Sequence, residues 1–299
     1  MRENDLIRLL RERATVPEGM RGIGDDCCEW TPGGRTCLSV DTVVEGVHFL
    51  ASDAPALIGR KAAGAALSDL AATGARPVGA VVAISLPAHW DGVAVMTGLL
   101  AELTRHGCPL LGGDTTGAAQ LTISVTVWGE AAGTRLLHRD RGEVGDLLIV
   151  TGPLGGSLAS GRHLRPEPRF AEGAWLAASP YVHAAMDISD GLASDAPRLA
   201  EASGCSCLLL PNQVPIHDDV TGLESTLRDG ARAACCDGED FELLAAISAE
   251  HWPHVQLAWP FAGRLAVVGW LTPEPGHTME DAYGRRVPLT LRGYEHLAP

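Results

Sequence analysis

The sequence has few aromatic residues and no apolar run long enough to cross a membrane. Aromatic residues make up 5% of its 299 positions, so alanine, valine and leucine must supply most of the core. No apolar run approaches the roughly 18 residues of a membrane-spanning helix. The first residues, MRENDLIRLLRER, are too charged for a signal peptide. We therefore expect a cytoplasmic protein without a membrane partner.

The cysteines do not follow a metal-binding or disulfide pattern. There are eight, and none forms a C-x-x-C pair, which argues against a zinc site. Two pairs are adjacent, Cys27–Cys28 and Cys235–Cys236, and neighbouring side chains of a strand point to opposite faces. We interpret the cysteines as reduced and mostly buried small hydrophobic residues.

The known phosphate-binding motifs are also missing. The sequence has no G-x-x-x-x-G-K-[ST] loop and no protein-kinase H-R-D motif, and GIGDD lacks the spacing of a dinucleotide fingerprint. Any bound phosphate must therefore be held by metal ions, by glycine-rich backbone such as Gly112–Gly113, and by a few basic groups. The formal net charge of -14 argues against nucleic acid as a partner but suits a protein that holds cations.

The remaining sequence alternates between strand-like and helix-like patterns. This order predicts an α/β or α+β protein, and its length suits two domains. The polar segment 131–145 marks the expected boundary, which gives domains 1–135 and 136–299. Periodicity predicts helices over 4–13, 55–72 and 91–106; strands over 36–44, 78–86, 121–130, 146–152, 205–210, 239–247 and 264–271; and a strand, turn and helix over 184–204.

Several acidic residues interrupt apolar patterns, where solvated surface acids are uncommon. Taken singly, each has an ordinary structural explanation: Asp190 suits a helix N-cap, Asp114 suits a turn, and Asp69 suits an ion pair with arginine. The stretches that carry these acids are GIGDDCC with Asp25 and Asp26, SVDTVVEGVHF with Asp41, AALSDLAATGA with Asp69, LLGGDTT with Asp114, AAMDISDGL with Asp187 and Asp190, and DGEDFELL with Glu239 and Asp240.

As a set, these acids indicate a metal site. Two carboxylates 4 Å apart repel by roughly 4 kcal/mol at an effective dielectric constant near 20, so converging acids need cations between them. Oxygen ligands favour Mg²⁺ or Ca²⁺ over zinc, and substrate phosphates usually complete the coordination of Mg²⁺. The pattern therefore favours nucleotide chemistry.

Taken together and in order, the motifs resemble those of thiamine-monophosphate kinases. The resemblance covers nearly the whole chain and ends at RGYEHL. Besides the acidic stretches, it rests on GRKAAGAALSDLAATGARP, ISVTVWGE, VGDLLIVTGPLGGSLA, HLRPEPR, MDISDGLASD and GEDFELL.

The resemblance implies a two-domain fold shared with aminoimidazole ribonucleotide synthetase, selenophosphate synthetase and a hydrogenase maturation factor. The N-terminal sheets are then expected to pair in a homodimer, and a C-terminal α/β sandwich domain to close over the nucleotide. The implied reaction is direct transfer of phosphate from ATP to thiamine monophosphate, giving thiamine diphosphate without a phosphoenzyme. The implied cofactor is Mg²⁺, several ions per site, with Mn²⁺ as an alternative.

The resemblance also assigns roles to individual positions. Val40 could contribute only its backbone, and Asp41, Asp114, Arg139 and Asp190 are the expected catalytic residues. The expected metal-site residues are Asp26, Ser39, Val40, Asp41, Asp69, Asp114, Asp187 and Asp190; the expected ATP-binding residues are Gly113, Arg139 and Ser189; and the expected substrate-binding residues are His48, Glu239 and Tyr294.

Three features depart from the family pattern. Gly117 stands where arginine is common, Asp237 stands where glycine is usual, and Cys27 and Cys28 replace small residues. The alternatives left open are another ATP-dependent member of the superfamily, a non-enzymatic nucleotide- or thiamine-phosphate-binding regulator, and a metal-dependent phosphatase. Selenophosphate synthesis usually needs a cysteine in an N-terminal glycine-rich loop, and Cys27 and Cys28 follow GIGDD instead.

Overall fold

The chain folds into two compact units. The structure is a computed structural model that describes residues 3–20, 30–221 and 227–295. The main change between the units, at Ala132–Gly133, lies within the polar segment 131–145. Unit 1 comprises Met1–Leu70, Ala75–Ala132 and Leu164–Pro168; unit 2 comprises Ala71–Gly74, Gly133–His163 and Arg169–Pro299.

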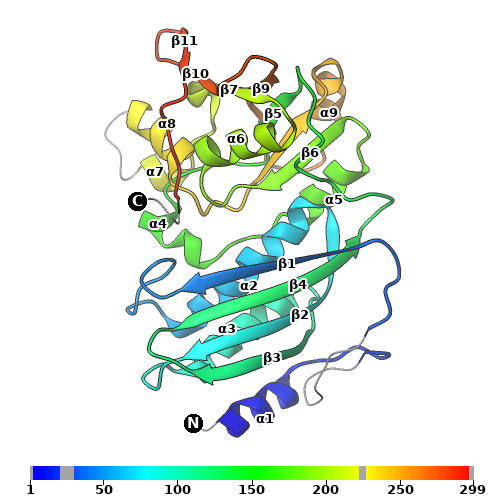
Figure 1. The fold of residues 1–299 in the computed structure, drawn as a ribbon, viewed down its shortest axis with the longest axis vertical. Coiled ribbons are helices and arrows are strands. Elements are labelled where there is room, and N and C mark those ends of the chain that lie inside the picture. The colour runs from blue at the N-terminus through cyan, green and yellow to red at the C-terminus, as the bar shows by residue number, and fades with distance from the viewer. Residues whose placement is uncertain (1–2, 21–29, 222–226, 296–299) are drawn as a thin grey trace. The chain divides into compact units, whose positions relative to one another are not determined.

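Unit 1 is built around a four-stranded sheet. The strands lie in the order β1-β4-β2-β3, so β1 and β3 form its two edges (Figure 1). β4 is antiparallel to both of its neighbours, and β2 and β3 are parallel. The elements are α1 (Glu3–Arg13), β1 (Thr36–Val44), α2 (Pro55–Ala72), β2 (Ala75–Leu86), α3 (Gly92–Arg105), β3 (Leu110–Gly117) and β4 (Thr122–Ala131).

Helices cover one face of this sheet, whereas the other face is open at β1 and covered at Trp128, where Trp30 packs against it. Ile123, Val125 and Val127 alternate along β4 and are fully buried, on the face that α2 and α3 cover (Figure 1). On the opposite face of β1, Leu38 is 65% exposed and Val40 is 59% exposed. The open face of unit 1 therefore presents apolar side chains that the described part of this chain does not cover.

The two helices α2 and α3 approach each other closely through glycines. A Cβ atom on Gly59 would lie 1.9 Å from Val95 O, and one on Gly98 would lie 1.8 Å from Ala56 O. No side chain fits at such distances, so both glycines are required by backbone contact. Lys61, on α2, is the only lysine in the sequence, and its side chain is 1% exposed.

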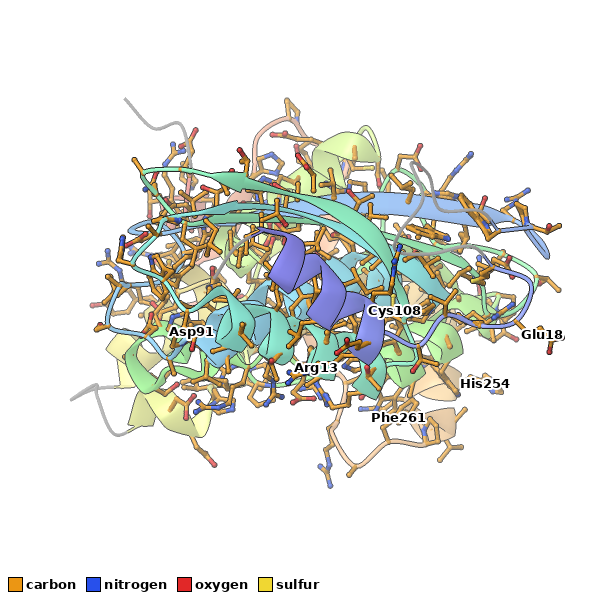
Figure 2. All side chains as sticks on the ribbon, turned by 90° about the horizontal axis from the view of Figure 1, so that it is seen from below. Arg13, Glu18, Asp91, Cys108, His254 and Phe261 are labelled. Carbon is orange, nitrogen blue, oxygen red and sulfur yellow. The ribbon has the colours of Figure 1, made fainter. Side chains whose placement is uncertain are left out.

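The N-terminal helix α1 packs against α3. Arg13 Nη1 donates a hydrogen bond to Thr97 Oγ1 at 3.0 Å, and Leu6 and Leu10 are buried. At the start of α3, Asp91 Oδ1 accepts from Val93 N at 3.1 Å and Ala94 N at 3.0 Å, which makes it the N-cap residue. Figure 2 labels Arg13 and Asp91 on this side of the molecule.

Unit 2 contains a seven-stranded sheet in the order β11-β10-β7-β9-β5-β8-β6. Its neighbouring strands are antiparallel except β7 and β10. The strands are β5 (Leu147–Val150), β6 (Val182–Asp187), β7 (Ser206–Leu209), β8 (Leu243–Ile247), β9 (Ala266–Thr272), β10 (Thr278–Glu280) and β11 (Arg286–Pro288); the helices are α4 (Ser157–Ser160), α5 (Phe170–Ala178), α6 (Leu192–Ala202), α7 (Asp218–Thr221), α8 (Leu227–Cys236) and α9 (Trp252–Ala258).

Both faces of this second sheet are buried. Alternate residues of β5 belong to different cores: Leu148 and Val150 pack with α6 and α8, whereas Ile149 packs with Leu176 of α5 and Val255 of α9. Continuous apolar runs are typical of strands that are covered on both sides. Unit 2 is therefore an α/β sandwich, as predicted.

The observed elements confirm the predicted α/β class. The strand predicted over 36–44 and the helix predicted over 55–72 have the same limits in the structure. Residues 110–117 were not predicted as a strand, yet they form β3. β10 and β11 were also not predicted. No helix in the described part of the chain is both long and apolar enough to span a membrane.

Candidate functional site

The first group of predicted site residues lies on β1 and α2 of unit 1. Ser39 and Asp41 are two residues apart and therefore share one face of β1. Ser39 Oγ donates a hydrogen bond to Asp69 Oδ2 on α2, and Thr42 N donates to Asp41 Oδ1 at 2.7 Å. Both β1 residues are half-buried. The structure thus brings Ser39 and Asp69 together, with Asp41 on the same face.

Two more predicted residues flank this group. Val40 points to the open face of the sheet and, having no polar side-chain atom, could offer a ligand only its backbone. In the loop after β1, His48 Nδ1 accepts a hydrogen bond from Val44 N at 3.1 Å. In the neutral ring the proton therefore resides on Nε2. Asp26, the remaining predicted metal ligand of unit 1, lies outside the described residues.

Gly113 and Asp114 lie on β3, at the other edge of the sheet. The strand register aligns Asp41 with Val125 of β4, and Val125 in turn with Val82 and Gly113. Asp114 is in the adjacent row of the sheet, so its side chain points to the opposite face from that of Asp41. Three strand intervals separate β1 from β3, or roughly 14 Å. Within one chain, the structure does not bring these two aspartates together.

Gly113 is required by the backbone geometry of β3. A Cβ atom at this position would lie 2.0 Å from Val82 O, closer than any real side chain approaches a carbonyl oxygen. Its neighbour Asp114 is exposed, as is Gly117 at the end of the strand. A Cβ atom on Gly117 would meet no described atom within 4 Å. The space at Gly117 is therefore open, and a larger side chain would fit there.

The second group of site residues surrounds a turn in unit 2. This turn, residues 187–190, joins β6 to α6. Ser189 N and Asp190 N both donate to Asp195 Oδ2, at 3.1 and 3.0 Å. Arg198 Nη1 donates to Asp190 Oδ2 at 2.5 Å and to Asp195 Oδ1 at 2.8 Å. Asp190 is therefore not the N-cap of α6; that position is Gly191, which has no side chain to accept a hydrogen bond.

Two further segments meet this turn through their backbones. Glu239 N donates to Ser189 O at 2.7 Å, and Tyr294 N donates to Asp190 O at 2.8 Å. Asp187, at the end of β6, is buried, and Tyr294 is 48% exposed. Five of the predicted residues, from three separate parts of the sequence, thus lie at one turn.

Arg139 lies in the loop before β5. Its carbonyl oxygen accepts a hydrogen bond from Ser203 Oγ at 2.9 Å, which fixes the backbone. Its side chain is exposed, and the guanidinium group has no hydrogen-bond partner among the residues that the structure describes. The group is thus available to an anionic ligand.

Sequence reasoning missed the residues that hold the turn in place. Asp195 is fully buried, and this burial, together with the charge of Asp190, raises its pKa to about 6, although Arg198 opposes the shift. An apolar helix with an aspartate and an arginine one turn apart was the available signal. Asp195 and Arg198 position the turn rather than offering groups to a ligand.

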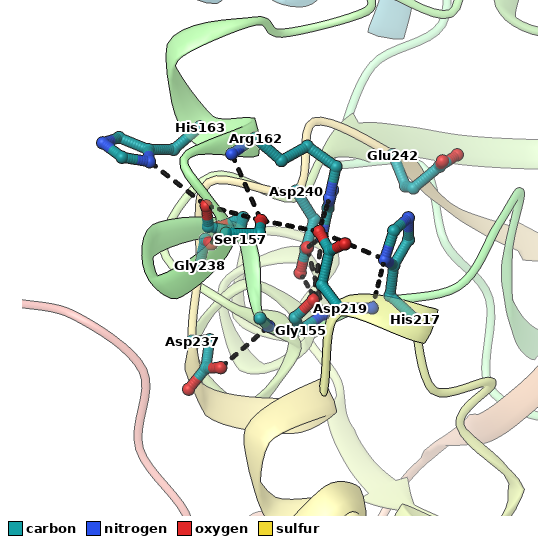
Figure 3. A network of polar contacts seen from close by, with 12 residues as sticks. Gly155, Ser157, Arg162, His163, His217, Asp219, Asp237, Gly238, Asp240 and Glu242 are labelled. Carbon is teal, nitrogen blue, oxygen red and sulfur yellow. Dashed lines mark hydrogen bonds and ion pairs between the residues drawn. The ribbon is translucent and has the colours of Figure 1, made fainter. Parts of the chain in front are cut away.

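A second missed network lies beside Glu239 (Figure 3). Asp240 accepts hydrogen bonds from Gly155 N through both carboxylate oxygens, each at 3.0 Å, and from Arg162 Nη2 at 2.8 Å. Burial raises the pKa of Asp240 to about 7, against the lowering effect of Arg162. Asp237, where glycine was expected, accepts from Gly156 N at 2.9 Å. This substitution therefore has a structural partner.

The described residues contain no group of three or more histidine, cysteine, aspartate or glutamate side chains placed to hold a metal ion. The acids of each unit occur instead as smaller sets: Asp41 and Asp69 in unit 1, and Asp187 and Asp190 in unit 2. All are oxygen donors, which fit Mg²⁺ or Mn²⁺ rather than a thiolate-bound metal.

Comparison with known proteins identifies the family. The family described as "AIR synthase related protein, N-terminal domain" matches residues 24–131. A curated thiamine-monophosphate kinase from Rhodopirellula baltica is 37% identical over 265 residues, which cover 83% of this chain and 83% of the relative. The chain belongs to the thiamine-monophosphate kinase family.

Solved structures agree with this assignment to the thiamine-monophosphate kinase family. The crystal structure of thiamine-monophosphate kinase from Stenotrophomonas maltophilia has a TM-score of 0.82 and 30% identity, covering 96% of this chain and 98% of its own. A second structure, described as "AaThiL complexed with AMPPCP and TMP", has a TM-score of 0.76 and 26% identity, covering 98% of this chain and 96% of its own. The two-domain fold expected from the resemblance is thereby confirmed.

Proposed function

We propose that the protein transfers the γ-phosphoryl group of ATP to thiamine monophosphate, giving ADP and thiamine diphosphate. The main support is the related structure that contains AMPPCP, an ATP analogue, together with TMP and covers nearly the whole length of this chain. The turn at 187–190 supports the same reaction, because it gathers Asp187, Ser189 and Asp190 with Glu239 at one place.

The site residues divide into three roles. Ser189, Gly113 and Arg139 bind ATP, and the exposed guanidinium group of Arg139 neutralises charge on the transferring phosphate. His48, Glu239 and Tyr294 bind thiamine monophosphate, with His48 offering the N–H group of Nε2. The proposed metal-site residues are Asp26, Ser39, Val40, Asp41, Asp69, Asp114, Asp187 and Asp190.

The reaction needs positioning and charge neutralisation more than covalent help from the protein. The acceptor is a phosphate, already anionic at neutral pH, so no side chain has to remove a proton from it. The proposed aspartates would hold Mg²⁺, which would supply charge neutralisation at both phosphate groups. The carboxylate oxygens of the aspartates are the proposed metal ligands, and the protein forms no covalent intermediate. We place the enzyme in the cytoplasm.

The sheet of unit 1 supports the proposal that the enzyme works as a homodimer. Asp41 and Asp114 are both proposed to hold metal, yet they lie on opposite edges and opposite faces of one sheet. The Asp114 side chain points to the open face of the sheet, so a second copy packed on that face would bring Asp114 of the partner subunit to the β1 edge that carries Asp41. Exposed Leu38 and Val40 supply an apolar surface for this pairing.

The reaction is tested by incubating the protein with ATP, Mg²⁺ and thiamine monophosphate and measuring thiamine diphosphate by chromatography. We expect one ADP for each thiamine diphosphate, and no product in excess EDTA. Asp190→Asn should reduce the rate by at least roughly a hundredfold, about 2.7 kcal/mol of barrier. Glu250→Gln, on the surface of unit 2, serves as the control. Phosphate release without thiamine diphosphate would contradict the proposal.

The shared site is tested by mixing two inactive variants. Asp41→Asn and Asp114→Asn chains carrying different tags are co-expressed, and the mixed dimer is purified through both tags. Two-fold symmetry leaves each mixed dimer with one intact site and one doubly altered site, so about half of the wild-type activity per dimer should return. If each chain forms its own complete site, the mixed dimer stays as inactive as its parents.

A further inference from the structure

We propose that Asp240 is a positioning residue for the acceptor substrate, acting through the backbone of its neighbour Glu239. This inference rests on the proposed function, in which Glu239 contacts thiamine monophosphate. Asp240 itself does not reach a ligand: its side chain is 1% exposed, and its oxygens are taken by Gly155 and Arg162.

The backbone on each side of Asp240 is in a conformation that side chains rarely adopt. Glu239 has φ 57° and Phe241 has φ 55°, the two non-glycine residues with positive φ in the described part of the chain. Such left-handed residues persist only where the surroundings fix them, and they concentrate at functional sites. Asp240, between the two, is hydrogen-bonded to Gly155 and Arg162, so its contacts help to hold this loop in its strained form.

The strained loop in turn holds the turn at 187–190. Glu239 N donates to Ser189 O at 2.7 Å, and Phe241 N donates to Ile188 O at 2.9 Å. Both N–H groups point at the turn because both residues are left-handed. If the loop relaxed to ordinary φ values, these donors would turn away and the Glu239 side chain would move with its Cα atom.

Arg162 connects Asp240 to the rest of unit 2 (Figure 3). Its Nη2 atom donates to Asp240 Oδ1 and to Gly155 O, both at 2.8 Å, and its Nε atom donates to Asp219 Oδ2 at 2.8 Å. The arginine thus ties the Glu239 loop to the 155–156 backbone from one side. Asp219 pairs with the same arginine but forms no hydrogen bond with the described residues of the loop, which makes it a matched control.

Other contacts keep the loop folded without Asp240. Ser157 Oγ donates to Gly238 O at 2.6 Å, and Gly156 N donates to Asp237 Oδ2 at 2.9 Å. Asp240→Asn also keeps one oxygen for Gly155 N. This substitution removes the charge that faces Arg162 while preserving side-chain volume, so the protein should fold with the Glu239 backbone less firmly held.

The experiment is a double-mutant cycle in steady-state kinetics with Glu239→Gln, Asp240→Asn and the double variant. We expect Asp240→Asn to raise the KM for thiamine monophosphate at least roughly tenfold, 1.4 kcal/mol, and to raise the KM for ATP by a smaller factor, because the same loop also holds the backbone of Ser189. Because Asp240 acts through Glu239, the double variant should lose no more kcat/KM than Glu239→Gln alone. Asp219→Asn should keep the wild-type KM values.

Several outcomes would overturn the inference. If the losses of kcat/KM in the two single variants multiply in the double variant, Asp240 does not act through Glu239. The same conclusion follows if Asp240→Asn leaves the KM for thiamine monophosphate unchanged. If Asp240→Asn fails to fold, Arg162→Lys breaks the same contact from the other side, and its KM must then rise in the same way. The proposed function fails separately: wild-type protein would then form no thiamine diphosphate.

Discussion

At the scale of single residues, Asp41 shows how a strand can carry a charge within an apolar run. β1 is an edge strand, and Asp41 is half-buried rather than enclosed. One of its oxygens accepts from Thr42 N at 2.7 Å, so the carboxylate avoids most of the several kcal/mol that burial without a partner costs. The residue is thus held in place, and the metal ion proposed above would bind its other oxygen.

We predict that Asp41→Asn abolishes phosphoryl transfer and leaves the fold intact. Asparagine keeps the oxygen that accepts from Thr42 N but loses the charge, so apo thermal stability should hold or rise. The increase in Tm caused by Mg²⁺–ATP should shrink, and kcat should fall by at least roughly a hundredfold. Asp53→Asn is the control, since Asp53 also accepts a backbone N–H, from Leu50 at 2.7 Å. Normal turnover with a lower apo Tm would mean a structural Asp41.

The raised pKa of Asp240 leads to a prediction about how the stability of the protein depends on pH. Its ordinary value of 3.8 rises to about 7 in the folded chain because of burial. Between about pH 4 and pH 7 the folded state therefore binds a proton that the unfolded state has lost, and the stability due to this group falls as pH rises. The Tm difference between wild type and Asp240→Asn should shrink from pH 5 to pH 8. A difference that widens would mean that Arg162 keeps Asp240 ionised.

At the scale of elements, the crossing of α2 and α3 sets the packing of unit 1. Gly98→Ala should destabilise the protein by about 1–3 kcal/mol, because the added methyl group meets Ala56 O. An exposed helix would instead gain about 1 kcal/mol from the same change. Gly230→Ala in α8 is the matched control, since the nearest atoms to its Cβ belong to side chains, Ile216 at 3.1 Å and Val220 at 3.8 Å. Thermal melts compare the two; equal Tm values would contradict the prediction.

Elements with strong hydrophobic periodicity could be predicted from the sequence. Elements that form because of pairing with a distant strand could not. Residues 36–44 alternate clearly, and helix 55–72 begins at proline and ends before Gly74, so local rules find their limits. β3 was hidden because Gly112, Gly113 and Asp114 suggest a turn. It is a strand because β2 pairs with it and Gly113 fits against Val82 O, contacts that no local pattern contains.

In the candidate site, too, the sequence motifs located individual residues but not the long-range contacts between them. Motifs located Ser189, Asp190, Glu239 and Tyr294, and the structure gathers these four at one turn. The sequence could not show that Asp41 and Asp114 lie on opposite edges of a sheet, because strand order depends on long-range pairing. Asp195 and Asp240 were missed as organising residues because their importance lies in burial and hydrogen bonds, which emerge only in the folded chain.

At the scale of the whole molecule, the open face of the unit 1 sheet should decide the oligomeric state. We predict that Leu38→Arg, on that face, shifts the protein from dimer to monomer in light scattering at micromolar concentration, because a charge would be buried in an apolar contact. Leu257→Arg is the control, since Leu257 is 89% exposed on unit 2. A Leu38→Arg protein that keeps the dimer mass would remove this face from the proposed interface.

The burial of Lys61 has a practical consequence for handling the enzyme. No other ε-amino group exists in the sequence, and this one is 1% exposed. An amine-reactive dye applied near neutral pH should therefore attach to the α-amino group alone, giving one fluorophore per chain without any engineered tag. A second fluorophore would enter only when α2 is uncovered, so counting dyes by mass spectrometry would report how often unit 1 opens.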